Sequence, residues 1–237
     1  MGMIAICIVN YNLPDMTDRL CERIGDVVQY PHALYVLDNG SDKAKPANST
    51  THAACPNRRT TGGWNEILMQ AAADGGYQGY WLLCNDVMFP RTTCPLTPLV
   101  SALHTFGMIH PAYTRNSGSS WRAMFHKPEI QIEDTGEVEF NAPLISAGCL
   151  HAVWPFRAAL TYGYGVDNES GYRARRAGFR VGVCHDAVVE HTPHTTYTSG
   201  ADSLNKSQYV QAASENMQEV FRQKYGENWK DVFKAGQ

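Results

Sequence analysis

Residues 3–12 read MIAICIVNYN, an unbroken apolar run that ends in a polar cluster. A strand that is apolar on both faces is typical of a parallel sheet covered by helices on each side. The pattern returns in residues 33–42, ALYVLDNGSD, and in residues 79–86, GYWLLCND. Each run predicts a buried strand that leads directly into polar residues.

Helical segments separate these strands. Pro14 stands in the first turn of a predicted helix that Asn12 would cap, and residues 20–28 carry apolar side chains at helical spacing. Gly62 opens a second predicted helix, which Asp74-Gly75-Gly76 closes. Strands that alternate with helices imply right-handed βαβ units, so we predict an α/β fold with a mainly parallel sheet flanked by helices.

The predicted binding site follows from where these strands end. Ligands of open α/β sheets bind beyond the carboxyl ends of the parallel strands. Here those ends carry residues 10–12, residues 38–41 and the pair Asn85-Asp86. We therefore expect the three polar clusters to share one edge of the sheet.

The rest of the chain has weaker patterns. Residues 91–141 predict irregular or antiparallel strands, because Pro-rich and Ser/Gly-rich pieces interrupt them. Residues 167–177 predict a short basic helix, followed by a strand at 179–183. The tail from Ser203 predicts amphipathic helices, with apolar side chains spaced by four. We find no repeat or linker and expect a single domain.

Composition narrows the functional classes. The chain has 237 residues, 43% hydrophobic and 18% charged, with a net charge of −3. With this net charge the protein has no overall positive potential that would attract nucleic acid or an anionic membrane. No apolar run approaches the roughly 20 residues that span a bilayer, so we expect no integral membrane segment. The apolar N-terminus lacks a basic flank, which favours a strand over a signal peptide.

Seven cysteines are scattered along the chain without a C-x-x-C pair. This spacing indicates neither a zinc knuckle nor a disulfide framework. Free thiols suit a reducing compartment, so we expect a cytoplasmic protein.

Five segments, in this order, resemble family-2 glycosyltransferases, which have the GT-A fold. They are residues 8–12, 36–42, 62–65, 81–87 and 163–181. A single one of these short motifs can arise by chance. Five motifs in the correct order are much harder to explain as coincidence. The resemblance implies one GT-A domain over residues 1–237, with a nucleotide-binding half (1–90), an acceptor and catalytic half (91–202) and a C-terminal helical tail (203–237).

The resemblance also implies an activity. Family-2 enzymes move a sugar from a nucleotide-diphospho-sugar to an acceptor hydroxyl with inversion, and we expect a UDP- or dTDP-linked donor. The cofactor implied is Mn²⁺ or Mg²⁺. The acceptor stays open among a carbohydrate, a lipid-linked glycan, a protein and a modified nucleic acid.

The resemblance places the nucleotide-sugar on residues from the first two strands, the second helix and the third strand. They are Val9, Asn10, Tyr11, Asn12, Asp38, Asn39, Gly63, Asn65 and Asn85. A carboxylate at a strand end can accept two hydrogen bonds from an imide or a diol. The alternative for Asp38 is an Asx-turn that serves only its own loop.

The predicted metal ligands are Asp86 and His191. The family has a D-x-D-like element here, and Asp86 matches its last position, whereas Cys84 replaces its first. We interpret Cys84 as a small buried side chain. His191 and His194 follow a further predicted strand near residues 187–189, where a histidine often reaches the metal or the phosphates in similar enzymes. Either could instead be an ordinary polar surface residue.

The predicted catalytic base is Asp167. The family has an E-D-like pair before the basic helix, and Val166 replaces its first member here. An inverting transfer needs a base that accepts the proton of the acceptor hydroxyl. Asp167 could instead cap the helix, although Asn168 could take that position and leave Asp167 free. Glu169 is a fallback base.

Two other functions stay open. A nucleotidyltransferase would use the same sheet edge, but it usually has a glycine-rich first loop with a lysine, which residues 9–12 lack. A non-catalytic nucleotide-sugar binding module would explain why Cys84 and Val166 stand where acids are expected.

Overall fold

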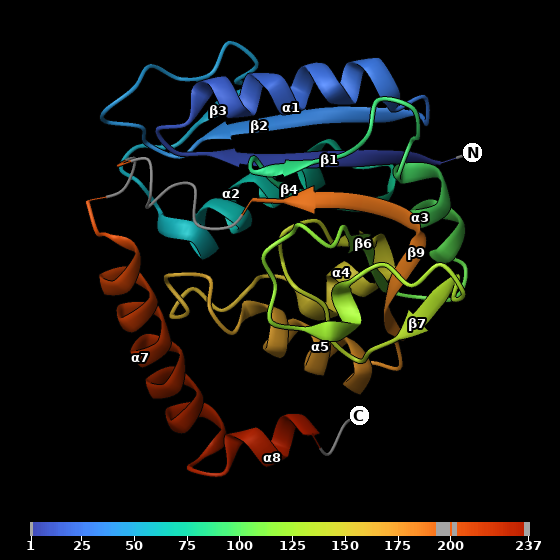
Figure 1. Ribbon diagram of the computed structural model, residues 1–237. Coiled ribbons are helices and arrows are strands. Elements are labelled where there is room, and N and C mark those ends of the chain that lie inside the picture. The colour runs from blue at the N-terminus through green and yellow to red at the C-terminus, as the bar shows by residue number, and fades with distance from the viewer. Residues whose placement is uncertain (1, 193–199, 201–202, 235–237) are drawn as a thin grey trace.

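The structure is a computed structural model that describes residues 2–192, 200 and 203–234. Its strands are β1 Met3–Asn10, β2 His32–Asp38, β3 His52–Ala53, β4 Tyr77–Cys84, β5 Val87–Met88, β6 Met108–Tyr113, β7 Ile132–Asp134, β8 Leu144–Ser146 and β9 Val181–His191. Its helices are α1 Pro14–Val27, α2 Arg59–Asp74, α3 Leu96–Ala102, the 3₁₀ turn η1 Arg122–Met124, α4 Ala147–Val153, α5 Val166–Arg176, α7 Lys206–Tyr225 and α8 Trp229–Lys234. Within the described residues the strands form one mixed sheet in the order β3-β2-β1-β4-β8-β6-β9-β5, with β7 paired to β9 (Figure 1).

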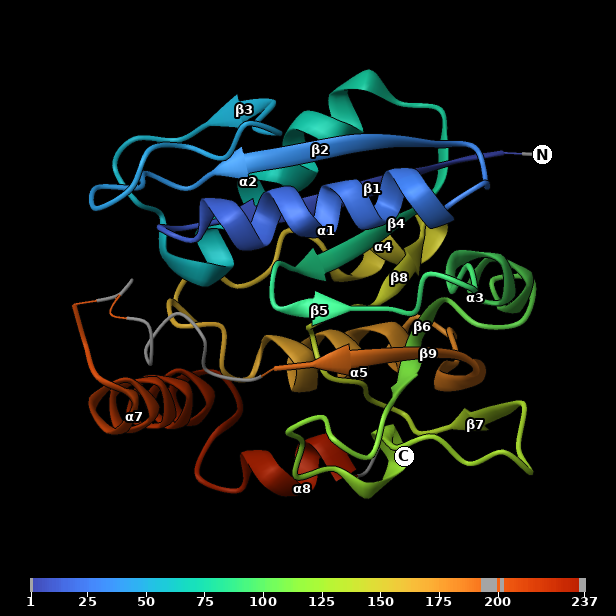
Figure 2. The same cartoon turned by 45° about the horizontal axis from the view of Figure 1, so that its top comes forward.

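The first half of the sheet is parallel, as predicted. β1 lies between β2 and β4 and pairs with both in parallel. Helices α1 and α2 cover opposite faces of these strands (Figures 1 and 2). This double cover explains why β1 is buried along most of its length and carries no alternation of polar side chains.

The second half of the sheet is mixed. β8 pairs antiparallel with both β4 and β6 and so joins the two halves. β6 runs parallel to β9, and β7 runs antiparallel to it. The expectation of irregular or antiparallel strands in residues 91–141 is therefore correct for β7 and correct in part for β6, which is antiparallel to β8 and parallel to β9. It misses helix α3.

The sequence of β6 obscures its burial. All six residues of the strand are buried, although His110 and Pro111 interrupt the apolar pattern. His110 is satisfied inside the protein, because its Nε2 accepts a hydrogen bond from the N–H of Ala142 at 3.0 Å. Burial lowers the pKa of His110 to about 3, so the ring stays neutral. Pro111 stands at a register shift in the β6–β9 pairing, where a missing N–H is tolerated.

Helix α1 begins at Pro14 as predicted, but Asn12 does not cap it. The cap position is Leu13, which makes no side-chain capping bond. Asn12 has a positive φ of 56°, and its Oδ1 accepts the backbone N–H groups of Asp42 at 3.0 Å and Lys43 at 2.9 Å. Asn12 therefore holds the loop after β2 instead of the helix.

The other predicted elements differ mainly at their ends. Helix α2 begins at Arg59, three residues before Gly62, and the last strand extends to His191. In α7 the side chains of Tyr209, Ala213 and Phe221 are buried, which confirms the predicted amphipathic face. No helix among the described residues is long and apolar enough to cross a bilayer.

Candidate functional site

Three strand ends meet at one edge of the sheet. Asn10 pairs with Asp38 across β1 and β2, and Val9 pairs with Cys84 across β1 and β4. The Nδ2 of Asn10 donates to Oδ1 of Asp38 at 3.1 Å. The Nδ2 of Asn85 lies 3.5 Å from Oδ1 of Asn10. The polar clusters expected to share one edge are thus linked directly.

This edge is buried and already rich in internal hydrogen bonds. Asp38 is 4% exposed, and it also accepts bonds from the backbone N–H of Ser41 at 3.1 Å and from its hydroxyl at 2.7 Å. The Asx-turn arrangement is therefore present. The contact between Asp38 and a nucleoside stays a prediction.

Asn39 and Gly63 fix helix α2 against the strand ends. The Nδ2 of Asn39 donates to the carbonyl of Arg59 at 3.0 Å, and its Oδ1 accepts from the N–H of Arg58 at 3.1 Å. A Cβ on Gly63 would lie 3.0 Å from both Asn39 Nδ2 and Val9 Cγ1. The glycine permits this close approach of the helix.

Three other residues that are predicted to bind the nucleotide-sugar form hydrogen bonds within the protein. The side-chain amide of Asn65 donates to the carbonyl of Phe156 and accepts from its N–H, both at 2.8 Å. The hydroxyl of Tyr11 donates to Oδ1 of Asp42 at 3.2 Å, and the Nδ2 of Asn12 donates to the same oxygen at 2.8 Å. Asn65 ties α2 to the segment after α4, and the other two tie the turn after β1 to the turn after β2.

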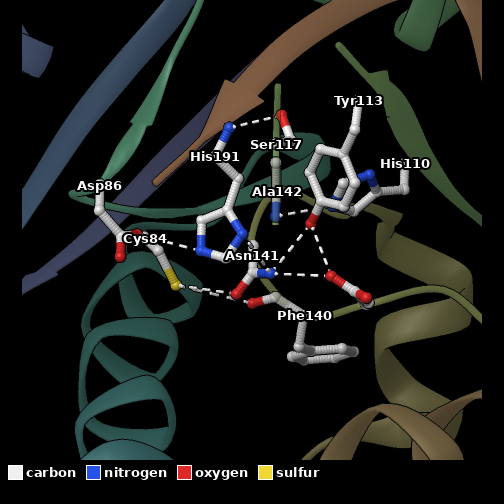
Figure 3. A network of polar contacts seen from close by, with 10 residues as sticks. Cys84, Asp86, His110, Tyr113, Ser117, Phe140, Asn141, Ala142 and His191 are labelled. Atoms are coloured by element: carbon white, nitrogen blue, oxygen red, sulfur yellow. Dashed lines mark hydrogen bonds and ion pairs between the residues drawn. The ribbon is translucent and has the colours of Figure 1, made fainter. Parts of the chain in front are cut away.

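Asp86 and His191 face one another. Strand β5 pairs antiparallel with β9, which sets Val87 opposite His191, and the N–H of Thr192 donates to the carbonyl of Asp86 at 3.1 Å. The Nε2 of His191 lies 3.6 Å from Oδ1 of Asp86 (Figure 3). Both side chains are largely buried, with 9% and 14% of their surface exposed.

This pair fits a divalent cation. Two ligands about 2.1 Å from one cation lie roughly 3.0–3.6 Å apart for angles between 90° and 120°. One carboxylate oxygen and one imidazole nitrogen suit Mn²⁺. Among the described residues no three His, Cys, Asp or Glu side chains converge as a metal site. The remaining ligands of such a cation would thus come from a diphosphate and water. The other predicted histidine, His194, lies outside the described residues.

Cys84 is partly buried and contacts the segment before β8. Its Sγ lies 3.7 Å from Oδ1 of Asn141 and 3.9 Å from the carbonyl of Phe140 (Figure 3). Burial, and secondarily the charge of Asp86, raises the pKa of the Cys84 thiol well above its usual value. Mn²⁺ and Mg²⁺ prefer oxygen ligands to sulfur, so Cys84 is a poor candidate ligand.

A second set of residues surrounds His191. The ring of Tyr113 stacks on the His191 ring with centroids 5.7 Å apart. The Nδ2 of Asn141 lies 3.4 Å from Nδ1 of His191. Glu139 accepts hydrogen bonds from the Tyr113 hydroxyl at 3.0 Å, from Asn141 Nδ2 at 3.2 Å and from the hydroxyl of Ser119.

Sequence reasoning missed these residues. Glu137, Glu139 and Asn141 alternate with apolar Val138 and Phe140. A period of two places alternate side chains on one face of an extended segment. That alternation was the available signal.

Asp167 lies in the first turn of α5. The cap position is Gly165, so Asp167 is not the N-cap. Its side chain is partly exposed, but the surrounding protein atoms remove most of the water from the carboxylate. Burial raises the pKa of Asp167 to about 7, the N–H of Asn168 opposes this shift, and the charges of Glu137 and Glu139 add to it.

Glu169 is engaged elsewhere. It is 2% exposed, and its carboxylate accepts two bonds from Arg157 Nε at 2.8 and 3.0 Å and one from the Tyr225 hydroxyl at 2.6 Å. This carboxylate joins α5 to α7 and to the segment after α4.

The sequence matches no family model, and no curated protein matches it in sequence. The fold does match solved structures. One is the mannosyltransferase PcManGT from Pyrobaculum calidifontis in complex with GDP-Man and Mn²⁺, with a TM-score of 0.59 and 13% identity over 98% of this chain and 73% of that chain. Another is GalNAc-T7 with UDP, GalNAc and Mn²⁺, with a TM-score of 0.69 and 12% identity over 99% of this chain and 51% of that chain.

The protein has the GT-A fold of nucleotide-sugar glycosyltransferases. At 12% and 13% identity, the similarity establishes the fold. The chain spans about half the length of the GalNAc-T7 chain that it matches.

Proposed function

We propose that this protein is a glycosyltransferase that moves a sugar from a UDP- or dTDP-linked donor to an acceptor hydroxyl with inversion, assisted by Mn²⁺ or Mg²⁺. The observation that carries the proposal is the Asp86–His191 pair, which adjoins the buried strand-end network on a GT-A fold. Both structural neighbours were solved with Mn²⁺ and a nucleotide or nucleotide-sugar.

In this proposal the donor lies along the sheet edge. The nucleoside meets the Asn10–Asp38 end, and the diphosphate lies beside Asp86 and His191, because Asn85 joins these two regions. The bound cation would act as a Lewis acid and neutralise the charge that develops on the departing diphosphate.

Asp167 is the proposed base. It accepts the proton of the acceptor hydroxyl while that oxygen attacks the anomeric carbon, and the bond to the diphosphate oxygen breaks with its electron pair leaving on the diphosphate. A single displacement of this kind inverts the anomeric centre. A base is most effective when its pKa is close to the working pH, and the pKa of Asp167 is about 7. Glu169 is a poorer candidate, because Arg157 and Tyr225 occupy its carboxylate.

The test is a thermal-shift panel of UDP-, dTDP- and GDP-sugars with and without Mn²⁺, followed by product analysis. A donor stabilises the fold in proportion to its affinity for the folded state, so we expect a shift that depends on Mn²⁺. We expect slow donor hydrolysis with Mn²⁺, and an inverted anomeric configuration in the product of any accepted acceptor.

Each alternative function predicts a different result. A binding module would show the shift without hydrolysis or transfer. A nucleotidyltransferase would release pyrophosphate from a nucleoside triphosphate. Donor affinity that is insensitive to EDTA would rule out the metal.

A further inference from the structure

Helix α7 packs along the segment that leads to the proposed base (Figures 1 and 2). The side chain of Asn216 binds this segment twice: its Oδ1 accepts from the N–H of Thr161 at 3.1 Å, and its Nδ2 donates to the carbonyl of Ala159 at 3.0 Å. The hydroxyl of Tyr209 donates to the carbonyl of Tyr162 at 2.6 Å. One face of α7 therefore holds the main chain of residues 159–162.

Two further contacts from α7 flank Asp167. Gly165 is the cap residue of α5 and has a φ of 83°. A Cβ at this position would lie 2.6 Å from Cζ of Phe221, so the glycine permits a close approach of α7. One turn into α5, the hydroxyl of Tyr225 donates to Oε1 of Glu169 at 2.6 Å. Asp167 thus stands between two points at which α7 contacts the start of α5.

Helix α2 holds the same segment from the side of the donor edge. The hydroxyl of Thr61 donates to the carbonyl of Leu160, and the hydroxyl of Thr60 lies 3.3 Å from that of Tyr209. The amide of Asn39 joins the start of α2 to the strand ends. Residues 159–165 therefore lie between α7 and the helix that borders the proposed donor site.

We infer that α7 positions the catalytic base: it holds residues 159–165 against α2, so that Asp167 keeps a fixed place relative to the donor edge, and Asn216 is the positioning residue that makes the most direct hold. The inference rests on the proposed function, because it takes Asp167 as the base. A misplacement of about 1 Å at a reacting group can lower the rate about 100-fold. Helix α7 is then a working part of the site, although it lies outside the motifs that suggest the fold.

The pKa of Asp167 reports its position. Burial raises this pKa to about 7, the N–H of Asn168 opposes the shift, and the charges of Glu137 and Glu139 add to it. Tyr164 faces the same carboxylate, since burial, and secondarily the charge of Asp167, raises the pKa of its hydroxyl. If the start of α5 loosens, water reaches the Asp167 carboxylate and its pKa falls toward 3.8.

The experiment compares Asn216→Ala with Asn205→Ala in the full chain. Asn205 caps α7 by accepting the N–H of Gln208 at 3.0 Å, and none of its described bonds reaches residues 159–165, so its loss weakens the same helix without releasing the segment. Three measurements are made: kcat for hydrolysis of UDP-, dTDP- and GDP-sugars with Mn²⁺, the thermal shift with UDP and Mn²⁺, and a carbon-13 NMR titration of the Asp167 carboxyl, whose signal Asp167→Asn identifies.

We expect Asn216→Ala to lower kcat about 10- to 100-fold, to lower the pKa of Asp167, and to leave the shift with UDP and Mn²⁺ unchanged. We expect Asn205→Ala to lower the Tm and to leave kcat and the Asp167 pKa unchanged.

Two results overturn the inference alone: an unmoved Asp167 pKa in Asn216→Ala, whatever its kcat, or equal changes in Asn205→Ala, which would indicate a general effect of helix stability. If the unmodified protein neither hydrolyses nor transfers from any donor, the proposed function fails and the inference fails with it. Should Asn216→Ala not fold, Tyr209→Phe keeps the ring and removes the bond to the carbonyl of Tyr162. A lowered kcat and Asp167 pKa in that variant support the inference, and an unmoved pKa overturns it.

Discussion

The Nε2 of His191 lies 3.6 Å from Oδ1 of Asp86, and backbone pairing holds the two residues in place. The β5–β9 ladder and the bond from Thr192 N–H to the carbonyl of Asp86 fix both main chains. The fold therefore holds the two side chains together without a bound cation. Such preorganisation lowers the cost of binding, because little has to be ordered at that moment.

Asp86→Ala should remove metal dependence and most activity. Loss of a metal that stabilises the leaving group by several kcal/mol predicts a decrease of roughly 100- to 1,000-fold in kcat/KM. The measurement is a Mn²⁺ titration of transfer or donor hydrolysis. Glu190→Ala is the control, since Glu190 is an exposed carboxylate next to His191. Retained Mn²⁺ activation in Asp86→Ala would assign the metal to other residues.

Asp167→Asn should abolish transfer and leave donor binding intact. Loss of a general base lowers kcat about 100- to 10,000-fold. The same variant should be more stable at pH 8, by about 1–3 kcal/mol for a partly exposed carboxyl, because asparagine stays neutral in a site that disfavours charge. Urea unfolding and donor titration provide the check. If the variant is inactive and also less stable, the loss of transfer activity results from impaired folding.

The pH dependence of transfer should follow Asp167. Its pKa is raised from 3.8 to about 7 in the folded protein, so the folded state keeps a proton that the unfolded state releases between these values. Stability therefore falls as the pH rises through this window, while kcat/KM rises toward a plateau above about pH 7. Glu137→Gln removes a charge that raises this pKa and should move the break to lower pH. If the break in the pH profile of kcat/KM does not move in Glu137→Gln, Asp167 is not the titrating base.

The parts of the site that lie at strand ends follow from the sequence. Apolar runs that stop at Asn10 and Asp38 define where strands end, and parallel strands deliver their ends to one edge. The resemblance places Asp86 and His191 in one site, and the structure brings them together. Local pattern and motif order suffice for these features.

The network around Glu139 could not be found in this way. It requires that a loop between β7 and β8 meets Tyr113 of β6 and His191 of β9, and this depends on the sheet order of the second half. The sequence hides that order, because Pro111 breaks the apolar pattern of β6. Asn12 shows the same limit at a smaller scale, since its partners lie in the loop after β2 and not in the adjacent helix.

Glu169→Ala should destabilise the protein, in contrast to Asp167→Asn. Glu169 is buried and holds Arg157 and Tyr225. Removing one partner of a buried ion pair leaves the other charge uncompensated, and we expect a loss of about 2–4 kcal/mol because Arg157 keeps some exposure. Urea unfolding measures the loss. Full stability with lost transfer would instead make Glu169 the base.

Gly63→Ala should destabilise the protein and weaken donor binding together. The new Cβ would lie 3.0 Å from both Asn39 Nδ2 and Val9 Cγ1, so α2 or the strand ends must shift, at a cost of about 1–3 kcal/mol. Gly25→Ala in α1 is the matched control, because nothing lies within 4 Å of its Cβ position. That variant should gain about 0.4–1 kcal/mol from reduced freedom of the unfolded chain. The measurements are urea unfolding and the thermal shift with UDP and Mn²⁺. If Gly63→Ala matched Gly25→Ala in both, the close approach of α2 would not support the donor edge.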